Sequence, residues 1–241
     1  YVRNTVNMLT DGIELPGVYG ATPPQMNTAD LRTKGYELSA TWHDNLKIFG
    51  HNLSYSVSAN LSNYDARITR YDNPEKVFAK SYYPGMKLGE IWGYHVDGLF
   101  ASDEEAAQYS SQVDLGVVAK NLPQGTWRAG DLKFADLDGD GKISVGEDSA
   151  LNPGDMKIIG NELPTLQYGF SGSLNYMGFD IYAFFQGTGN HYWYPNGYNY
   201  QFWGSFSDPV AGYIPRNFID QCWSKDNPGA YFPRPLGQSA K

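Results

Sequence analysis

The chain has 241 residues, a formal net charge of −8 and a single cysteine, Cys222. The negative charge argues against a nucleic-acid partner, because phosphate binding needs clustered Lys and Arg, and one cysteine excludes an internal disulfide framework. Aromatic residues make up 15% of the chain, which also has 27 Gly and 14 Pro, a composition typical of strands joined by turns.

The first predicted strands lie in the N-terminal quarter of the chain. A weak strand pattern covers residues 1–9, and apolar and polar residues then alternate strictly at 36–43 and 53–62. Such alternation indicates strands with one face against an apolar phase and the other against water. We expect residues 44–52 to connect the two alternating strands.

A second pair of strands is predicted further along the chain. Residues 166–176 alternate in the same way, and Met177-Gly178 has the form of a two-residue hairpin turn. A return strand then covers residues 179–186, where Tyr182 and Phe184 lie on the second face. The sequence therefore predicts two antiparallel hairpins.

The connections between these strands differ strongly in length. Segments 44–52 and 177–178 are short, whereas 10–34, 63–165 and 187–241 are long. Membrane β-barrels have short turns on one side and long loops on the other, and their strands need only about 9–11 residues to cross the bilayer. The pattern favours a transmembrane barrel, with a soluble β-sandwich carrying long loops as the alternative.

One short helix is predicted inside the segment 63–165. Ser102 and Glu105 have the spacing of a capping box, and the acidic residues 103–105 suit the positive end of a helix dipole. The predicted fold is therefore all-β, a partial barrel of antiparallel strands with long loops and one short helix.

Residues 136–147 read DLDGDGKISVGE and match the spacing of a calcium-binding loop. Calcium prefers six to eight oxygen ligands, and acidic side chains at alternate positions converge on one centre when a glycine permits a sharp bend. The predicted ligands are the side chains of Asp136, Asp138, Asp140, Ser144 and Glu147, with the backbone carbonyl of Lys142.

Two further residues of this motif have structural roles. We expect Gly141 to form the bend and Ile143 to anchor the loop through a short β-like contact. Pro and Gly residues on both flanks leave no room for long helices, so the motif predicts a structural Ca²⁺ that stabilises a long loop. The alternative is a solvated acidic turn without a metal.

The segment 191–206 is dense in aromatic residues. Flat rings can stack on sugars or grip peptides, and a self-packed loop is the alternative. The candidate substrate contacts are Trp193, Tyr194, Tyr198 and Trp203. The sequence lacks a Ser nucleophile elbow, a phosphate-binding glycine loop and a zinc pattern, so we expect no enzyme activity.

Eight short motifs follow one another along the chain. They are TKGYEL at 33–38, IWGY at 91–94, DGLF at 97–100, GDLKF at 130–134, IGN at 159–161, YGF at 168–170, GFD at 178–180 and FFQG at 184–187. In order and spacing they resemble the C-terminal barrel half of the SusC/RagA family of TonB-dependent outer-membrane proteins of Bacteroidetes.

This resemblance implies a role in nutrient import. It implies that residues 1–241 are the C-terminal portion of a plugged barrel of about 22 strands, with 63–165 as a long extracellular loop carrying the calcium-binding loop. It implies outer-membrane lipid around the barrel, a SusD-like surface lipoprotein as partner, TonB acting through a missing N-terminal part, and import of oligosaccharides or peptides. A soluble calcium-stabilised carbohydrate-binding β module is the alternative function.

Overall fold

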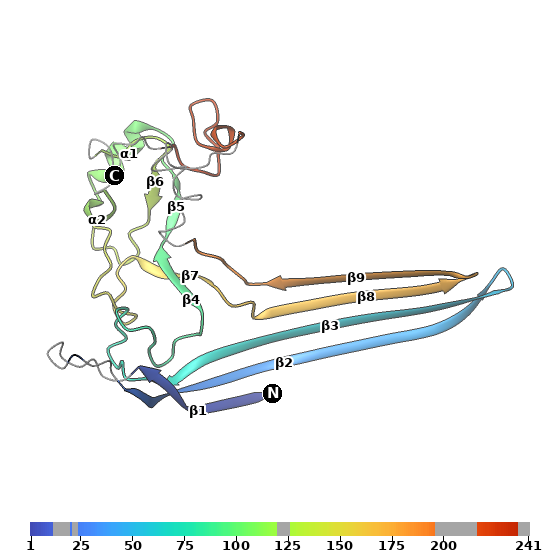
Figure 1. Cartoon of the computed structure of the whole chain (residues 1–241). Coiled ribbons are helices and arrows are strands. Elements are labelled where there is room, and N and C mark those ends of the chain that lie inside the picture. The colour runs from blue at the N-terminus through green and yellow to red at the C-terminus, as the bar shows by residue number, and fades with distance from the viewer. Residues whose placement is uncertain (12–19, 21–23, 120–125, 196–215, 236–241) are drawn as a thin grey trace. The chain divides into compact units, whose positions relative to one another are not determined.

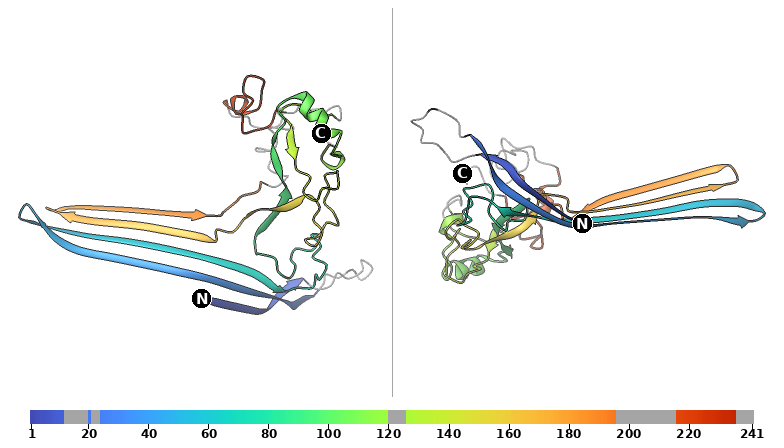
Figure 2. Two further views of the ribbon diagram at one scale, coloured as in Figure 1. Left: turned by 180° about the vertical axis from the view of Figure 1, so that it is seen from behind. Right: turned by 90° about the horizontal axis from the view of Figure 1, so that it is seen from below.

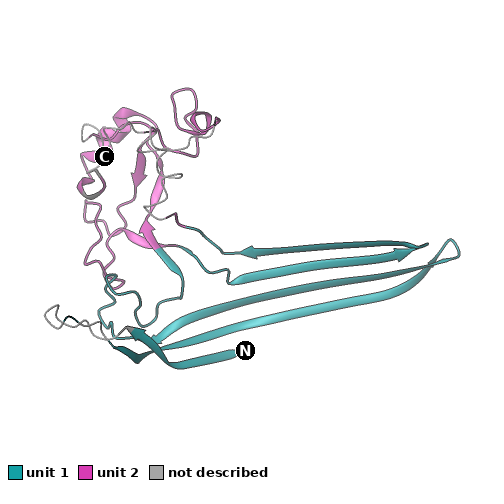
Figure 3. Cartoon of the chain, viewed as in Figure 1, with its two compact units in different colours: residues 1–91, 160–193 teal, residues 92–159, 194–241 magenta. Residues whose placement is uncertain are grey.

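The structure is a computed structural model that describes residues 1–11, 20, 24–119, 126–195 and 216–235. The chain divides into two compact units, coloured in Figure 3. The first comprises residues 1–91 and 160–193, and the second comprises residues 92–159 and 194–241. The first is dominated by one antiparallel sheet, and the second is built from short elements.

Five strands form the sheet of the first unit, in the order β1-β2-β3-β8-β9 (Figure 1). They are β1 (Val2–Asp11), β2 (Gln25–Ile48), β3 (His51–Arg70), β8 (Leu166–Tyr176) and β9 (Phe179–Gly189). All neighbouring strands are antiparallel, and β3 pairs with β8 although a long segment separates them in the sequence. Within the described residues β1 and β9 are edge strands, so the sheet is not closed.

Strands β2, β3 and β9 are longer than the sequence pattern predicts, whereas β8 has the predicted bounds. The predicted connection at 44–52 is wrong, because β2 and β3 stay paired as far as Ile48 and His51. Only Phe49 and Gly50 form the turn, with φ of 50° and 82°. The predicted turn at 177–178 is confirmed. At the other end β3 continues to Arg70, into the segment that the sequence assigned to a loop.

The two faces of the sheet differ as the alternation predicts. Leu38 pairs with Leu61, which pairs with Tyr168, and the next row joins Ser39, Asn60 and Gly169. The apolar row and the polar row therefore continue across strands on opposite faces. Figure 2 shows these strands as a single layer, and apolar side chains such as Leu38 are exposed, at 62%. The apolar face is thus not a core within the described residues.

Aromatic residues pack along this apolar face. The ring of Tyr168 lies against Gly187 of the neighbouring strand, so closely that any Cβ at position 187 would clash with the ring. The Trp42 indole donates a hydrogen bond to the Tyr55 hydroxyl at 3.3 Å. Both contacts join neighbouring strands, and Trp42 and Tyr168 remain exposed.

An ionic cluster joins three strands at the end of the sheet away from the two turns. The Arg70 guanidinium donates to both carboxylate oxygens of Asp30, each at 2.8 Å, and to the side-chain oxygen of Asn7. Asn7 lies at an irregularity of β1 with φ of 57°. Its backbone N–H donates to Asp30, so the cluster fastens β1 to β2 and β3.

The second unit consists of short strands and helices. Its elements are β5 (Val96–Leu99), α1 (Asp103–Ser110), α2 (Gly116–Ala119), β6 (Leu132–Phe134) and the 3-10 helix η3 (Ile219–Gln221). β5 pairs with β6, and β4 (Glu90–Tyr94) pairs with β7 (Met156–Asn161). None of the helices among the described residues has the length and apolar character needed to cross a bilayer.

Helix α1 begins as the capping pattern predicts. The Ser102 hydroxyl accepts a hydrogen bond from the backbone N–H of Glu105 at 3.2 Å. The Glu105 carboxylate accepts from the backbone N–H of Ala101 and from the Lys133 ammonium, which fastens the helix to β6. The predicted short helix is therefore confirmed.

The second unit is held together by a small aromatic core and a buried ion pair. Phe100 is fully buried, and its ring centroid lies 5.6 Å from that of Tyr109 and 6.2 Å from that of Trp127. Asp131, also buried, accepts two hydrogen bonds from the guanidinium of Arg234, at 2.6 and 2.9 Å. This bidentate pair fastens a C-terminal segment to the start of β6.

Candidate functional site

Three carboxylates of the second unit converge on one point. Asp136, Asp138 and Asp155 each place an oxygen within 4.8 Å of the other two. Asp155 is fully buried, and its carboxylate accepts hydrogen bonds from the backbone N–H groups of Leu137 at 2.6 Å and Ser144 at 2.7 Å. Because Asp155 is buried and hydrogen-bonded, its carboxylate is held in place on one side of the cluster. The Asp138 side chain, by contrast, is exposed to solvent.

The acidic loop curls around its own carboxylates. Asp136 accepts hydrogen bonds from the backbone N–H groups of Gly139 at 2.7 Å and Gly141 at 3.0 Å. Both glycines have positive φ, 76° and 81°, which a side chain would strain. Asp138 accepts from the N–H of Asp140 at 3.1 Å. The predicted bend at Gly141 is present.

Asp155 was not among the predicted ligands, and its place in the cluster comes from a fold-back of residues 146–154. Gly146 and Gly154 approach so closely that a Cβ on either would lie 2.6 Å or less from the backbone nitrogen of the other. The N–H of Asp155 then donates to the carbonyl of Ser144 at 3.0 Å. Glu147 lies on the fold-back, is exposed, and is outside the three-carboxylate cluster.

The remaining predicted ligands lie at the rim of the loop. Asp140 accepts from the backbone N–H of Lys142 at 2.9 Å, and its other oxygen lies 3.5 Å from the Lys142 ammonium. The Ser144 hydroxyl accepts from the backbone N–H of Gly146 at 3.2 Å. The Asp140 carboxylate is therefore turned toward Lys142 and not toward the other three carboxylates.

A short β-like contact anchors the loop, as predicted for Ile143. Its side chain is 1% exposed and packs with Val113 and Leu115. Its backbone N–H donates to the carbonyl of Asp114 at 2.7 Å, and the N–H of Asp114 donates to Gly141 at 2.8 Å. The loop is thus joined to a core, which keeps its carboxylates in place.

The surroundings of the cluster are electrostatically negative. The hydroxyl of Tyr94 is buried and has no hydrogen-bond partner among the described residues. Burial, together with the charges of Asp155 and Asp148, raises the pKa of Tyr94 above its usual value.

The donor set fits a calcium ion. Calcium–oxygen distances are about 2.3–2.6 Å, so two oxygens on one ion lie at most about 4.6–5.2 Å apart. The three carboxylates satisfy this limit without rearrangement. Carboxylate oxygens are also the hard ligands that Ca²⁺ prefers over nitrogen or sulfur.

The predicted aromatic contacts are only partly described. Trp193 and Tyr194 are 71% and 58% exposed, so their rings are accessible. Tyr198 and Trp203 lie outside the described residues. The aromatic segment therefore offers two accessible rings directly after β9.

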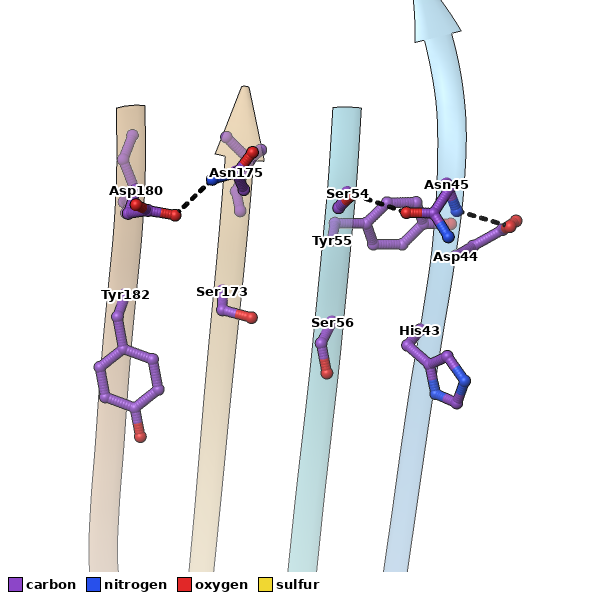
Figure 4. A pocket seen from close by; sticks show the side chains of 12 residues that line it. His43, Asp44, Asn45, Ser54, Tyr55, Ser56, Ser173, Asn175, Asp180 and Tyr182 are labelled. Carbon is purple, nitrogen blue, oxygen red and sulfur yellow. Dashed lines mark hydrogen bonds between the residues drawn. The ribbon is translucent and has the colours of Figure 1, made fainter. Parts of the chain in front are cut away.

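The polar face of the sheet has two hollows that the sequence analysis did not identify. The first has a volume of about 350 Å³ and lies near the two turns. Figure 4 shows His43, Ser56, Ser173 and Tyr182 in one row across its four strands. All four side chains are at polar-face positions of the alternation.

The second hollow has a volume of about 550 Å³ and lies further along β3, β8 and β9. Its lining includes the carboxamides of Asn60, Gln167 and Gln186, the hydroxyl of Thr188 and the ring of Phe184. Carboxamides both donate and accept hydrogen bonds. These five lining side chains carry no formal charge, so this part of the face suits neutral hydrogen-bonding groups.

Comparison with known proteins gives two relatives from Formosa agariphila. TonB-dependent receptor P3 is 28% identical over 189 residues, which cover 72% of this chain. TonB-dependent receptor P26 is 24% identical over an alignment of 258 residues that covers 99% of this chain. The chain spans only 16% and 22% of the lengths of these relatives. No protein-family model matches the chain.

Solved structures with the same fold include those of the RagAB peptide transporter. One matches 97% of this chain with a TM-score of 0.58 and 16% identity. The "open-open" state of the RagAB peptide importer matches with a TM-score of 0.61 and 14% identity. The chain covers 23% and 22% of these structures. Together the matches confirm the resemblance to SusC/RagA-type TonB-dependent receptors and the antiparallel, barrel-type strand arrangement.

Proposed function

We propose that this chain forms part of the barrel wall and the long surface loops of a TonB-dependent import receptor in the outer membrane. The observation that carries the proposal is the exposed apolar face of a single-layer sheet. Trp42 and Phe185, for example, are each 65% exposed on that face. Soluble monomers rarely leave continuous apolar patches larger than a few hundred Å² uncovered.

The length of the apolar face supports a bilayer as its environment. Ten residue steps separate Leu166 from Tyr176 along β8, where every position of this face is uncharged, or about 33 Å at 3.3 Å per residue. At a strand tilt of about 40° this spans about 25 Å along the membrane normal, the height of the lipid-facing band of such barrels. Tyr36 and Tyr168 mark one end of the face, and Tyr176 lies at the other.

A soluble carbohydrate-binding module would need to bury this face. In a β-sandwich a second sheet packs about 10 Å away, with side chains of both inner faces interdigitated. The described residues of the first unit contain one sheet, with neither face covered by another. The soluble alternative is therefore not favoured.

The polar face supplies the lining of an aqueous passage. Its carboxamides and hydroxyls suit either sugar hydroxyls or a peptide backbone, so the cargo is an oligosaccharide or a peptide. The SusD-like surface lipoprotein would meet the long loops, where Trp193 and Tyr194 offer exposed rings for cargo. TonB would act through parts of the receptor outside this chain.

We also propose that the acidic loop binds Ca²⁺ through Asp136, Asp138 and Asp155. Its role is structural, because binding joins two ends of a long loop whose own core is small. Isothermal titration with Ca²⁺ tests the assignment on the complete receptor. Asp155→Asn should weaken binding at least about tenfold, whereas Glu147→Gln should leave it unchanged. Equal effects of the two substitutions would contradict this ligand set.

A lipid-soluble carbene label tests the barrel assignment. In the complete receptor in vesicles, the label should modify Leu38 and Phe185 on the apolar face. It should spare their neighbours Ser39 and Gln186 on the polar face. Equal labelling of both faces, or none on either, would refute a membrane-embedded wall.

A further inference from the structure

Both hairpin turns carry an apolar residue where a small polar one is favoured. Phe49 and Met177 occupy the first turn position with φ of 50° and 52°, followed by Gly50 and Gly178. Type I′ turns prefer Asn, Asp or Gly at this left-handed position. Phe49 is 93% exposed and Met177 57% exposed. Neither backbone preference nor burial within the chain explains these two side chains.

The two turns lie at the same end of the sheet (Figure 1). β3 and β8 are neighbours, and Leu53 near the first turn pairs with Tyr176 at the second. The Tyr176 hydroxyl donates to the carbonyl of Ile48 at 3.1 Å, and its ring packs edge-on against that of His51 at 6.4 Å. Tyr176 therefore joins the two tips into one surface.

This surface continues the apolar face of the sheet. Ile48 and Phe179 flank the two turns at apolar-face positions, and both are exposed. Phe49 and Met177 extend that face past the last paired residues of each hairpin.

We propose that the two turn tips are anchors in the head-group and acyl boundary of the membrane. This inference rests on the proposed membrane position of the sheet, and lipid is the occupant because the apolar surface of the tips is continuous with the lipid-facing side. The apolar faces of interfacial amphipathic helices are buried about 5–10 Å in this boundary, and we expect a similar depth for the apolar side chains of the tips. On this proposal lipid, and not protein, covers the strained turn residues.

Depth-dependent fluorescence quenching tests the proposal on the complete receptor in a cysteine-free background. A bimane label is placed at position 49, at Ile181 on the apolar face, or at Ser173 on the polar face. Vesicles carry nitroxide lipids labelled at the head group or deep in the acyl chain. We expect shallow-nitroxide quenching at position 49, deeper quenching at Ile181 and none at Ser173.

The outcomes separate the two proposals. If Ile181 is quenched and position 49 is not, the tips lie in water and the anchor proposal fails while the membrane wall stands. If neither is quenched, the membrane wall itself fails.

A second variant tests the side chain of Phe49 and not only its position. Phe49→Asn places a favoured residue in the turn, so it should raise stability in detergent and lower the folded-to-unfolded ratio in vesicles by about tenfold. Phe49→Trp should behave like the wild type in vesicles. Unchanged folding of Phe49→Asn in vesicles would overturn the anchor role.

Discussion

A charge placed on the lipid-facing side of β2 should be far more costly than the same charge one residue away. Ala40 lies on the apolar face, pairs with Ala59, and is exposed. It is four residue steps from Tyr36 and six from Leu46, or about 10 and 15 Å along the membrane normal at a 40° tilt. Ala40 is therefore near the middle of the band.

An arginine on the lipid-facing side of a barrel, near the bilayer midplane, lowers the free energy of unfolding by about 2–4 kcal/mol, whereas positions that face the lumen tolerate charge. Ala40→Arg should thus lower the folded-to-unfolded ratio about 30- to 1,000-fold. Ser39→Arg is the matched control, because Ser39 is exposed on the polar face of the same strand.

The assay is equilibrium folding of the complete receptor into vesicles over a denaturant series, followed by intrinsic fluorescence. Both variants are also measured in detergent, which reports the effects of the new arginine that do not depend on the lipid bilayer. Equal destabilisation by the two substitutions in vesicles would refute the assignment of faces. If only Ser39→Arg lowered the stability in vesicles, the lipid-facing and lumen-facing sides of the sheet would have to be exchanged.

Three predictions concern the second unit. Arg234→Ala should destabilise it on the order of 3 kcal/mol, measured by hydrogen exchange, because Asp131 stays buried without its bidentate partner. Ser102→Ala should lower the free energy of opening of helix α1, measured by hydrogen exchange, by about 1 kcal/mol, because the first turn loses its N-cap hydrogen bond. Hydrogen bonds from Lys133 and from the backbone hold the pKa of Glu105 below its usual range. The pair therefore stabilises the fold above the unfolded pKa of about 4.3, and this is lost as pH falls through the lowered pKa. Glu105→Gln should flatten the stability profile below the unfolded pKa of about 4.3, and an unchanged slope would contradict this account.

Local rules predicted the elements that depend on neighbours in sequence. Period-two alternation placed the central parts of four strands, and Met177-Gly178 and Ser102 marked a turn and a helix start. The error at residues 44–52 has a physical reason. Asn45 and Gly50 are residue types that favour turns, which is why the sequence predicts the connection over 44–52. Cross-strand pairing as far as Ile48 and His51 overrides the turn preference of Asn45 and confines the turn to Phe49 and Gly50.

The candidate metal site shows the same division. The spacing of Asp136 and Asp138 is a local property, and both reach the cluster as the motif predicts. Asp155 lies beyond the motif, and no spacing rule identifies it. It joins the cluster because two glycines with positive φ let the chain fold back onto Ser144.

The sequence alone determined the two-faced character of the strands, since alternation and two-residue turns are encoded by adjacent residues. Only the tertiary structure decided which segments meet: β3 beside β8, Asp131 with Arg234, and Asp155 with Asp136. These contacts join residues distant in the chain, and their free energy comes from packing and pairing that appear only once the backbone has closed the intervening loops.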